Sequence, residues 1–592
     1  METAREKRVM ALLEDFRSTL SRLGIQRLLR AFMRAMSSWA TGWISMVACV
    51  RVACASVACA SVACLIAVKP TFADDADPQA HARSNRPLVS ASTIDFWVEQ
   101  GWQRRGVRSA PLSDEATFAR RIYLDLAGRI PTVDELDRYL VDDHDDKRAK
   151  LVDQLLSSPE YARHMADVFD TILMGRGGPK VYRRRAESGW RRYLEEVFAA
   201  NRPWDRVARE LLLARPSNAT DKAATWFLYE RNDKYQEIAE AVSSAIFGVQ
   251  IQCAQCHDHP LASEVEQRHY WGLVGFFRRS KNVDTADGPR VSESAVGGFE
   301  EFANLSGMSQ PNLLTYLQAG VVSETRPEAG SQSKDSEDLY LAGASASDPK
   351  VPKFSRRERF VDEVLPSHPL LARAMVNKLW ALLLGRGLSH PHDKLDSMHS
   401  PSHPELLDAL ANGFVQSGYD IRLLVRAIVL SRPYQLDSRR DAGSHDPADF
   451  AWFIERPLPA EVWARNVAKL VRSQDTVDDR LLAEIREQFS DVLPEEVVTP
   501  LKNGLFLSNH QRLDEYLAES RDREHLTPRL VALPDHQARV NYLFRRAFAR
   551  LPDDEELAQG VAYLSQREDR LVAALDQLVW SLMAGAEFRF QH

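Results

Sequence analysis

Residues 253–257 of this chain read Cys-Ala-Gln-Cys-His, the C-x-x-C-H spacing at which c-type haem is attached. Two thiols three residues apart can each form a thioether bond to one porphyrin. The imidazole of the next residue can then reach the iron as its proximal ligand. We therefore take Cys253, Cys256 and His257 as candidate haem-binding residues, and the chemistry they predict is electron transfer.

The same residue types permit two other interpretations. Thiolate and imidazole are good ligands for zinc and iron, so Cys253, Cys256, His257 and His259 could instead bind a metal ion. An exposed C-x-x-C pair could also oxidise to a local disulfide without any cofactor. A thioredoxin-like role has little support, because no β-α-β pattern flanks the motif.

A haem iron in an electron carrier usually has a second axial ligand, and no residue of this sequence is marked out for that role. Met308 follows the motif on an expected loop, and thioether ligation there would raise the reduction potential. His164 and His269 are further candidates. His259 lies too close to His257 to reach the opposite face of the same iron.

A second histidine-rich tract lies in the C-terminal half, and prolines interrupt it. Pro404 stands at a plausible first helical position, so we expect these histidines to be mostly loop and helix-cap residues. No G-x-S-x-G or H-E-x-x-H pattern appears, which gives a hydrolase no support. The histidines of this tract are His390, His392, His399 and His403.

The N-terminal region predicts export. Residues 43–68 form an apolar tract in which Arg51 is the only charge, with basic residues before it and acidic residues after it. The small residues at 71–73 favour a secretory signal peptide that ends at Ala73. An uncleaved membrane anchor is the alternative, and a lipidated cysteine is a third. Each possibility makes residues 1–73 a signal peptide or anchor and places the rest in the periplasm or cell envelope.

The distribution of cysteines agrees with this prediction. Four of the six cysteines lie in the apolar tract at five-residue intervals, so they share no helix face and suit a hydrophobic segment better than a metal site. Cys253 and Cys256 are then the only cysteines of the exported part, which has no disulfide framework. Residues 1–73 hold 10 of the 76 basic and 4 of the 83 acidic residues, so the exported part has 66 basic and 79 acidic residues. Its net charge of −13 argues against a nucleic-acid partner. We expect an unidentified redox partner, and membrane contact only through the N-terminal segment.

Beyond residue 90 the apolar residues recur at helical spacing, and few stretches alternate as strands do. We therefore expect a mainly α fold with two helical lobes, residues 90–281 and 354–592. Residues 282–353 are rich in Ser, Gly, Ala and Asp and should form an irregular connection between the lobes. The expected helices of the first lobe are residues 92–104, 116–127, 133–141, 147–156, 188–200, 204–213 and 233–248.

The two ends of the exported part resemble each other. Residues 129–136 read RIPTVDEL and residues 550–557 read RLPDDEEL. In each copy one helix should stop before the proline, and the next should begin at Thr132 or Asp553. Glu135 or Glu556 follows three residues later, which predicts a capping box in both places. We interpret the repeat as a reused helical hairpin that builds structure.

Several longer motifs resemble known families. Residues 120–132 (RRIYLDLAGRIPT) and 253–260 (CAQCHDHP) resemble the planctomycete cytochrome-associated family PSCyt-two. Residues 376–380 (VNKLW), 385–388 (GRGL) and 401–407 (PSHPELL) resemble its usual companion, PSD-one. The resemblance implies an exported protein found beside cytochrome-type modules, with no established reaction.

Together these observations favour an exported protein with a c-type haem that takes part in extracytoplasmic electron transfer. A metal-dependent enzyme with zinc or iron is one alternative. A non-catalytic surface or scaffold protein, which would need no cofactor, is the other.

Overall fold

The structure is a computed structural model of the chain. It describes residues 89–216, 218, 220–328, 334–341, 349–439, 446–489, 491–493, 501–518 and 525–592. These residues belong to one unit, Pro78–His592. The expected export segment, residues 1–73, lies outside the described residues, so its role stays a prediction.

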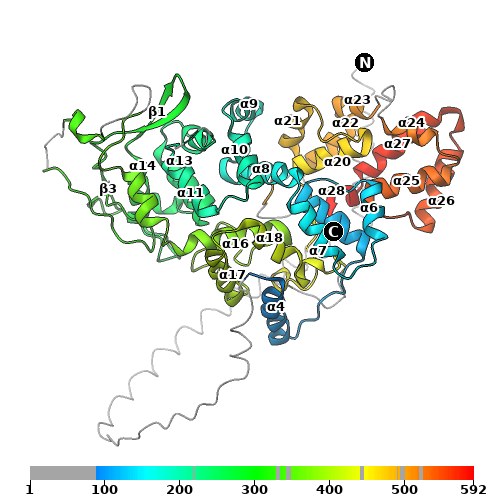
Figure 1. Ribbon diagram of the computed structural model, residues 1–592, viewed down its shortest axis with the longest axis horizontal. Helices are drawn as coiled ribbons and strands as arrows, with labels where there is room; N and C mark the ends of the chain where they lie inside the picture. Colours follow the sequence, from blue (N-terminus) through cyan, green and yellow to red (C-terminus); the bar gives the residue numbers. More distant parts are fainter. Residues whose placement is uncertain are drawn as a thin grey trace, which may run out of the picture. The chain divides into compact units, whose positions relative to one another are not determined.

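The fold is mainly helical, as expected, with 58% helix and 6% strand (Figure 1). Every helix expected in the first half is present, and 116–127 and 233–248 each end in a π-helical turn, η1 (Tyr123–Ala127) and η3 (Ser243–Phe247). The helices of the first half are α4 (Ala91–Arg105), α5 (Glu115–Ile122), α6 (Val133–Leu140), α7 (Lys147–Leu156), α8 (Pro159–Met174), α9 (Pro179–Glu187), α10 (Trp190–Ala199), α11 (Trp204–Leu213), α12 (Trp226–Tyr229), α13 (Tyr235–Val242) and α14 (Gln267–Phe277).

A second helical series follows residue 355. No helix in the described part of the chain has both the length and the apolar character needed to cross a membrane. The helices of this series are α15 (Arg356–Arg359), α16 (Pro369–Leu384), α17 (Pro404–Gln416), α18 (Ile421–Val429), α19 (Arg432–Gln435), α20 (Ala460–Arg472), α21 (Asp479–Gln488), α22 (Leu501–Asn509), α23 (Gln511–Ala518), α24 (Leu526–Val531), α25 (His536–Phe548), α26 (Asp554–Ser565), α27 (Leu571–Ala584) and α28 (Ala586–Arg589).

The connection between the two series is less irregular than the sequence predicts. It contains two antiparallel hairpins, β1 (Ser280–Thr285) with β2 (Gly288–Glu293), and β3 (Glu301–Ala303) with β4 (Ser309–Pro311). A third pair joins β5 (Arg456–Pro457) to β6 (Phe590–Gln591). These strands escape sequence analysis because their residues are mostly polar and show little apolar alternation.

The β1–β2 hairpin is anchored by a buried carboxylate. Glu293 at the end of β2 accepts hydrogen bonds from Ser355 Oγ at 2.6 Å and from the Arg356 backbone N–H at 2.6 Å. It also pairs with the buried Arg357 at 3.4 Å. Moving the hairpin away would leave Glu293 or Arg357 as an uncompensated buried charge, which is costly. These contacts therefore hold the hairpin against the start of the second helical series.

The apolar core does not divide at residues 282–353. One cluster of buried side chains contains residues from both sides of this connection, mainly between Val89 and Phe453, together with Val492 and Ala549. A second cluster is built mainly from residues beyond Leu458, and only Leu124 and Ile130 come from the first half. The division between cores therefore falls near residue 455, because α16, α17 and α18 pack against α4 and η3 rather than against the C-terminal helices.

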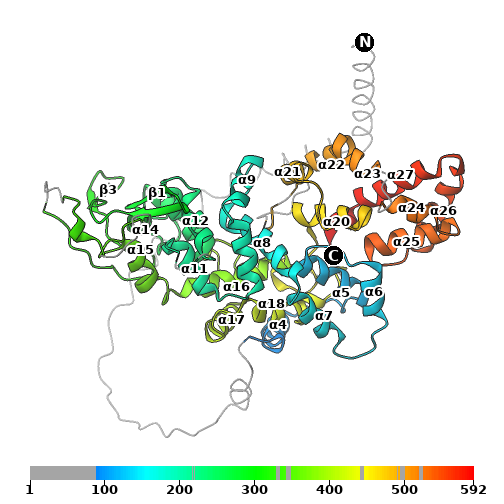
Figure 2. The ribbon, with the colours of Figure 1, turned by 45° about the horizontal axis from the view of Figure 1, so that its top comes forward.

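The internal repeat predicted from the sequence is confirmed. Thr132 caps α6 and Asp553 caps α26. In both copies the carboxylate of the glutamate three residues later accepts a hydrogen bond from the backbone N–H of the cap residue. Both are complete capping boxes. In each copy the preceding helix ends in a left-handed residue, Gly128 at φ 66° and Ala549 at φ 61°. The two hairpins lie side by side in Figures 1 and 2. An ion pair joins Arg545 of α25 to Asp137 of α6.

Each copy also contains the same arginine clamp. Arg129 donates two hydrogen bonds to Glu135, both at 2.8 Å, and a third to the Ile130 carbonyl at 3.1 Å. Arg550 donates to Glu556 at 2.7 and 2.9 Å and to the Leu551 carbonyl at 3.1 Å. The bidentate geometry fixes the angle between the two helices of each hairpin.

Arg121 ties three distant parts of the chain together. Its side chain is fully buried and donates to the backbone carbonyls of Tyr434, Leu436 (2.9 Å) and the terminal residue His592 (3.1 Å). The guanidinium lies 3.6 Å from the centre of the Phe453 ring. A cation so placed is stabilised by the ring as well as by the carbonyls.

Asp125, one turn further along in η1, completes this buried polar network. Its carboxylate accepts from Tyr434 Oη at 2.7 Å, from Gln591 Nε2 at 2.8 Å and from Arg456 Nη2 at 2.7 Å. These donors lie more than 300 residues away in sequence. Asp125 therefore fixes the C-terminal strand pair against η1.

A second buried carboxylate joins α20 to the first half of the chain. Glu461 is 5% exposed and accepts from Arg176 at 2.5 Å and from Arg486 at 2.8 Å. Burial by itself raises the pKa of the Glu461 carboxyl. The two guanidinium groups outweigh burial and lower the pKa to about 2.

Glu461→Gln should therefore destabilise the protein by about 3 to 5 kcal/mol at pH 7, because the half-buried Arg176 and Arg486 lose the charge of their shared buried partner. A carboxyl with a depressed folded pKa stabilises above its unfolded pKa and loses that contribution as the pH falls toward 2. The difference between variant and wild type in urea unfolding should shrink between pH 5 and pH 2. Glu363→Gln, at an exposed pair, should change stability by less than about 1 kcal/mol. Equal losses in the two variants would contradict the prediction.

Candidate functional site

The C-x-x-C-H motif lies on a short 3₁₀ helix, Gln252–Gln255, and both of its cysteines are free thiols at the surface. Ala254 between them is fully buried and anchors the turn. Neither thiol is used in a disulfide or a hydrogen bond within the described part of the chain. The motif therefore presents two free cysteines to solvent from a backbone that the buried Ala254 anchors.

Helix α14 holds the motif from one side. The Gln255 carbonyl accepts from Gln267 Nε2 at 3.2 Å and from Trp271 Nε1 at 3.1 Å. The same Gln267 amide donates to the Ala303 carbonyl of β3 at 3.1 Å, so one buried side chain connects the motif to the β3–β4 hairpin. Both hairpins lie beside α14 in Figures 1 and 2.

The hydrogen bonding of His257 leaves one ring nitrogen available. Its Nδ1 lies 2.7 Å from the Asp258 carbonyl oxygen. A carbonyl can only accept, so Nδ1 is the donor, and in the neutral ring the lone pair is on Nε2. This is the tautomer of a histidine that binds a metal through Nε2, with its other nitrogen oriented by a backbone carbonyl.

His259 is used differently. Its Nδ1 accepts from the backbone N–H of Ala262 at 2.8 Å and of Leu261 at 3.3 Å, so the proton of the neutral ring is on Nε2. These hydrogen bonds give His259 a turn-capping role. Among the described residues, the ligand atoms of Cys253, Cys256, His257 and His259 do not come together as a group of three or more within 4.8 Å. The arrangement therefore favours His257 over His259 as a ligand.

Two protein-family models match this chain. Residues 93–282 match PSCyt2, "Protein of unknown function (DUF1549)", and residues 356–476 match PSD1, "Protein of unknown function (DUF1553)". The chain therefore contains a PSCyt2 domain and a PSD1 domain. Both resemblances seen in the sequence are thereby confirmed. No curated protein and no solved structure matches the chain.

The PSD1 domain supports the motif of the PSCyt2 domain from the other side. In the segment before the motif, Gly248 accepts from the Leu395 backbone N–H at 2.8 Å, and Gln250 donates to Asp393 at 3.0 Å. Gly248 has φ 68°, and a Cβ there would come within 2.9 Å of Leu395. A glycine is required at this position both by the backbone angle and by the close approach of the PSD1 loop.

The three candidate distal ligands lie in different environments. Met308 is 61% exposed at the tip of the β3–β4 hairpin, which the Gln267 contact attaches to the motif. His164 is buried, its Nδ1 accepts from Arg465 at 3.2 Å, and burial lowers its pKa to about 3. His269 is buried in α14, accepts from the Glu266 backbone N–H, and its pKa is lowered by burial. The two histidines thus have structural roles, and Met308 stays a prediction.

The histidine tract of the PSD1 domain consists mainly of loop and cap residues, as expected. His403 is the N-cap of α17 with Pro404 in its first turn. Burial and the neighbouring Arg105 lower the His403 pKa to about 4. His399 pairs with Asp396 at 2.7 Å. His390 and His392 differ, because both line a cavity.

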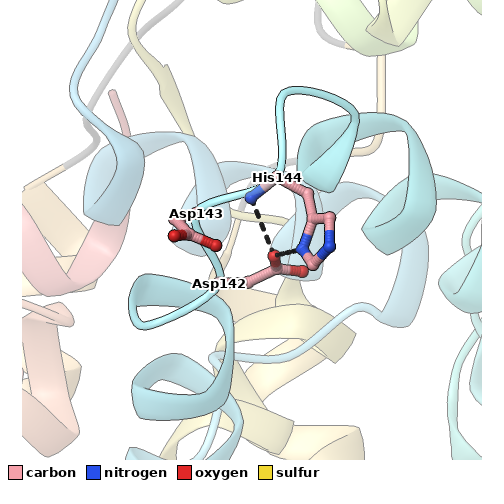
Figure 3. A group of neighbouring side chains, drawn as sticks. All are labelled: Asp142, Asp143 and His144. Carbon is pink, nitrogen blue, oxygen red and sulfur yellow. Dashed lines mark hydrogen bonds and ion pairs between the residues drawn. The ribbon is translucent and has the colours of Figure 1, made fainter.

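One group that the sequence did not single out is Asp142, Asp143 and His144, on the loop between α6 and α7 (Figure 3). It is the only group of three potential ligands within 4.8 Å in the part of the chain that the structure describes. Asp142 Oδ1 accepts from the His144 backbone N–H at 3.0 Å and lies 2.6 Å from its Nδ1. These contacts form an Asx turn, which accounts for the cluster without a metal.

Gln267→Leu should loosen the motif, because the Gln255 and Ala303 carbonyls both lose a buried donor, at a cost of about 1 to 3 kcal/mol. Hydrogen–deuterium exchange should become faster in residues 253–262 and 301–311 and stay unchanged elsewhere. Gln252→Leu is the matched control, because Gln252 is exposed on the same 3₁₀ helix. Unchanged exchange in the motif of the Gln267 variant would show that α14 does not hold it.

Proposed function

We propose that this PSCyt2/PSD1 protein is exported and carries a c-type haem on Cys253 and Cys256, and that it takes part in extracytoplasmic electron transfer. The observation that carries the proposal is the state of His257, whose Nδ1 is committed to the Asp258 carbonyl while Nε2 is left available. The two free, exposed thiols supply the other requirement of the motif.

The donor set fits haem better than a tetrahedral zinc site. Structural zinc needs four ligands around one point, and the thiols and imidazoles of the motif are not gathered in this way. Two thioether bonds need only the C-x-x-C spacing, and the proximal bond needs only one imidazole nitrogen. When bound, the haem would supply a one-electron iron couple at the surface of the PSCyt2 domain.

The residues of this chain would position the attached group. Ala254 and the Gln255 carbonyl hold the two thiols on one turn, and the Asp258 carbonyl keeps the His257 ring oriented. The exposed motif would leave an edge of the group open to a redox partner. Electron transfer by direct contact requires such exposure.

The proposal predicts covalent haem in protein made in a host with a cytochrome c maturation system. Its Soret band should survive denaturation, because thioether bonds do not depend on folding. Cys253→Ser with Cys256→Ser should abolish attachment, and His257→Ala should change the spectrum of the iron. His259→Ala, two residues away, should leave that spectrum unchanged because His259 caps a turn.

The other outcomes separate the alternatives. If the wild type shows no haem band but binds zinc or iron that the cysteine variants lose, the motif is a metal site and not a haem site. A wild type with neither haem nor metal would contradict a redox function and favour a surface or scaffold protein.

The proposed export leads to a second prediction, which concerns the N-terminus of the mature protein. The basic residues before the apolar tract and the small residues at 71–73 predict a mature N-terminus at Asp74 in the native host. N-terminal sequencing of the extracytoplasmic fraction measures this directly. Full-length chain in the membrane fraction would support an anchor instead, and a cytoplasmic full-length chain would contradict export.

A further inference from the structure

A cavity of about 40 Å³ lies where the PSCyt2 domain, the PSD1 domain and the C-terminal strand meet. This volume corresponds to about three water molecules, at 10 to 15 Å³ each, which suits a small ion or the head group of a larger ligand. The walls come from η1, α8, the end of α16 and the start of α20. The polar side chains of the lining are Asp125, His164, Arg386, His390, His392, Arg456 and Gln591.

Most of the charge in this lining is already balanced. Asp125 and Arg456 pair with each other at 2.7 Å. His164 is neutral, because burial lowers its pKa to about 3, and its Nδ1 accepts from Arg465. Neither the carboxylate nor this imidazole therefore requires a ligand.

Arg386 is the exception. It is half-buried at the cavity wall, and it makes no hydrogen bond or ion pair with any other residue that the structure describes. α16 ends at Leu384, and Gly385 turns the chain out of the helix at φ 78°. A Cβ at residue 385 would press against Ile454 at 3.3 Å, so glycine allows the close turn that precedes Arg386.

An unpaired guanidinium in a partly desolvated pocket is costly unless a counter-charge is supplied. Its planar fork of N–H donors matches the oxygen atoms of a carboxylate, phosphate or sulfate. His390 and His392 line the same cavity. Among the residues that the structure describes, the lining thus has one positive charge without a counter-charge, Arg386, and its volume admits a small oxyanion.

We propose that this cavity binds a small oxyanion, either inorganic phosphate or sulfate or the carboxylate of a small organic acid, through Arg386. The site is separate from the C-x-x-C-H motif, and its test requires no haem. The oxyanion would be bound between the two family domains, so its binding would favour their assembled arrangement over the unfolded chain.

The test uses the full chain, with phosphate, sulfate and acetate compared with chloride at equal ionic strength. At least one oxyanion should raise the thermal unfolding midpoint and bind saturably in isothermal titration calorimetry. Phosphate or sulfate as the preferred ligand would identify a tetrahedral anion, and acetate would identify a carboxylate. Arg386→Gln should weaken binding about tenfold or more, the ratio expected for losing a charge-assisted hydrogen bond.

Arg108→Gln is the matched control, because Arg108 is an exposed arginine that makes no contact of this kind either. It should leave binding unchanged. If Arg386→Gln does not fold, hydrogen–deuterium exchange of the wild type with and without the preferred anion tests the site instead. The anion should slow exchange in residues 381–392 and 456–462. Absence of saturable binding, equal binding by Arg386→Gln, or protection only elsewhere would overturn the proposal.

Discussion

The structure depends on one buried charge in the π-turn η1. Asp125 receives hydrogen bonds from Tyr434, Arg456 and Gln591, and each of these donors belongs to the second half of the chain. A carboxylate at 9% exposure is tolerated only because all three donors reach it. Arg121, on the preceding turn, uses the same surroundings to bind the C-terminal residue. The PSCyt2 motif that contains both residues therefore organises the PSD1 domain and the C-terminus.

These buried hydrogen bonds explain why the PSCyt2 and PSD1 domains of this chain are packed together. The first apolar core mixes residues of both domains, and the loop of the PSD1 domain at 393–395 holds the segment that leads into the C-x-x-C-H motif. The C-x-x-C-H motif is thus positioned in part by a domain other than its own. The oxyanion cavity has the same origin, because its walls come from both domains and from the C-terminal strand. Each candidate site depends on the domains being assembled.

The helices that sequence analysis found are those with one apolar face, such as α6, α10 and α11, together with the two capping boxes. Helix α8 was not among them, because it is buried on most of its surface and has no clear polar face. The β1–β2 hairpin was missed for the opposite reason. Its residues are mostly polar, and the hairpin is held by Glu293 and a buried arginine rather than by alternating apolar side chains.

The sequence by itself determined the family, the mainly helical fold, the repeat and the spacing of Cys253, Cys256 and His257. These properties depend on residue type and on short-range periodicity. Only the tertiary structure decided that His257 keeps Nε2 available while His259 caps a turn, and that Arg386 lines a cavity without a partner among the described residues. The physical reason is that the protonation of a ring and the pairing of a charge are set by neighbours, and several of these neighbours lie hundreds of residues away.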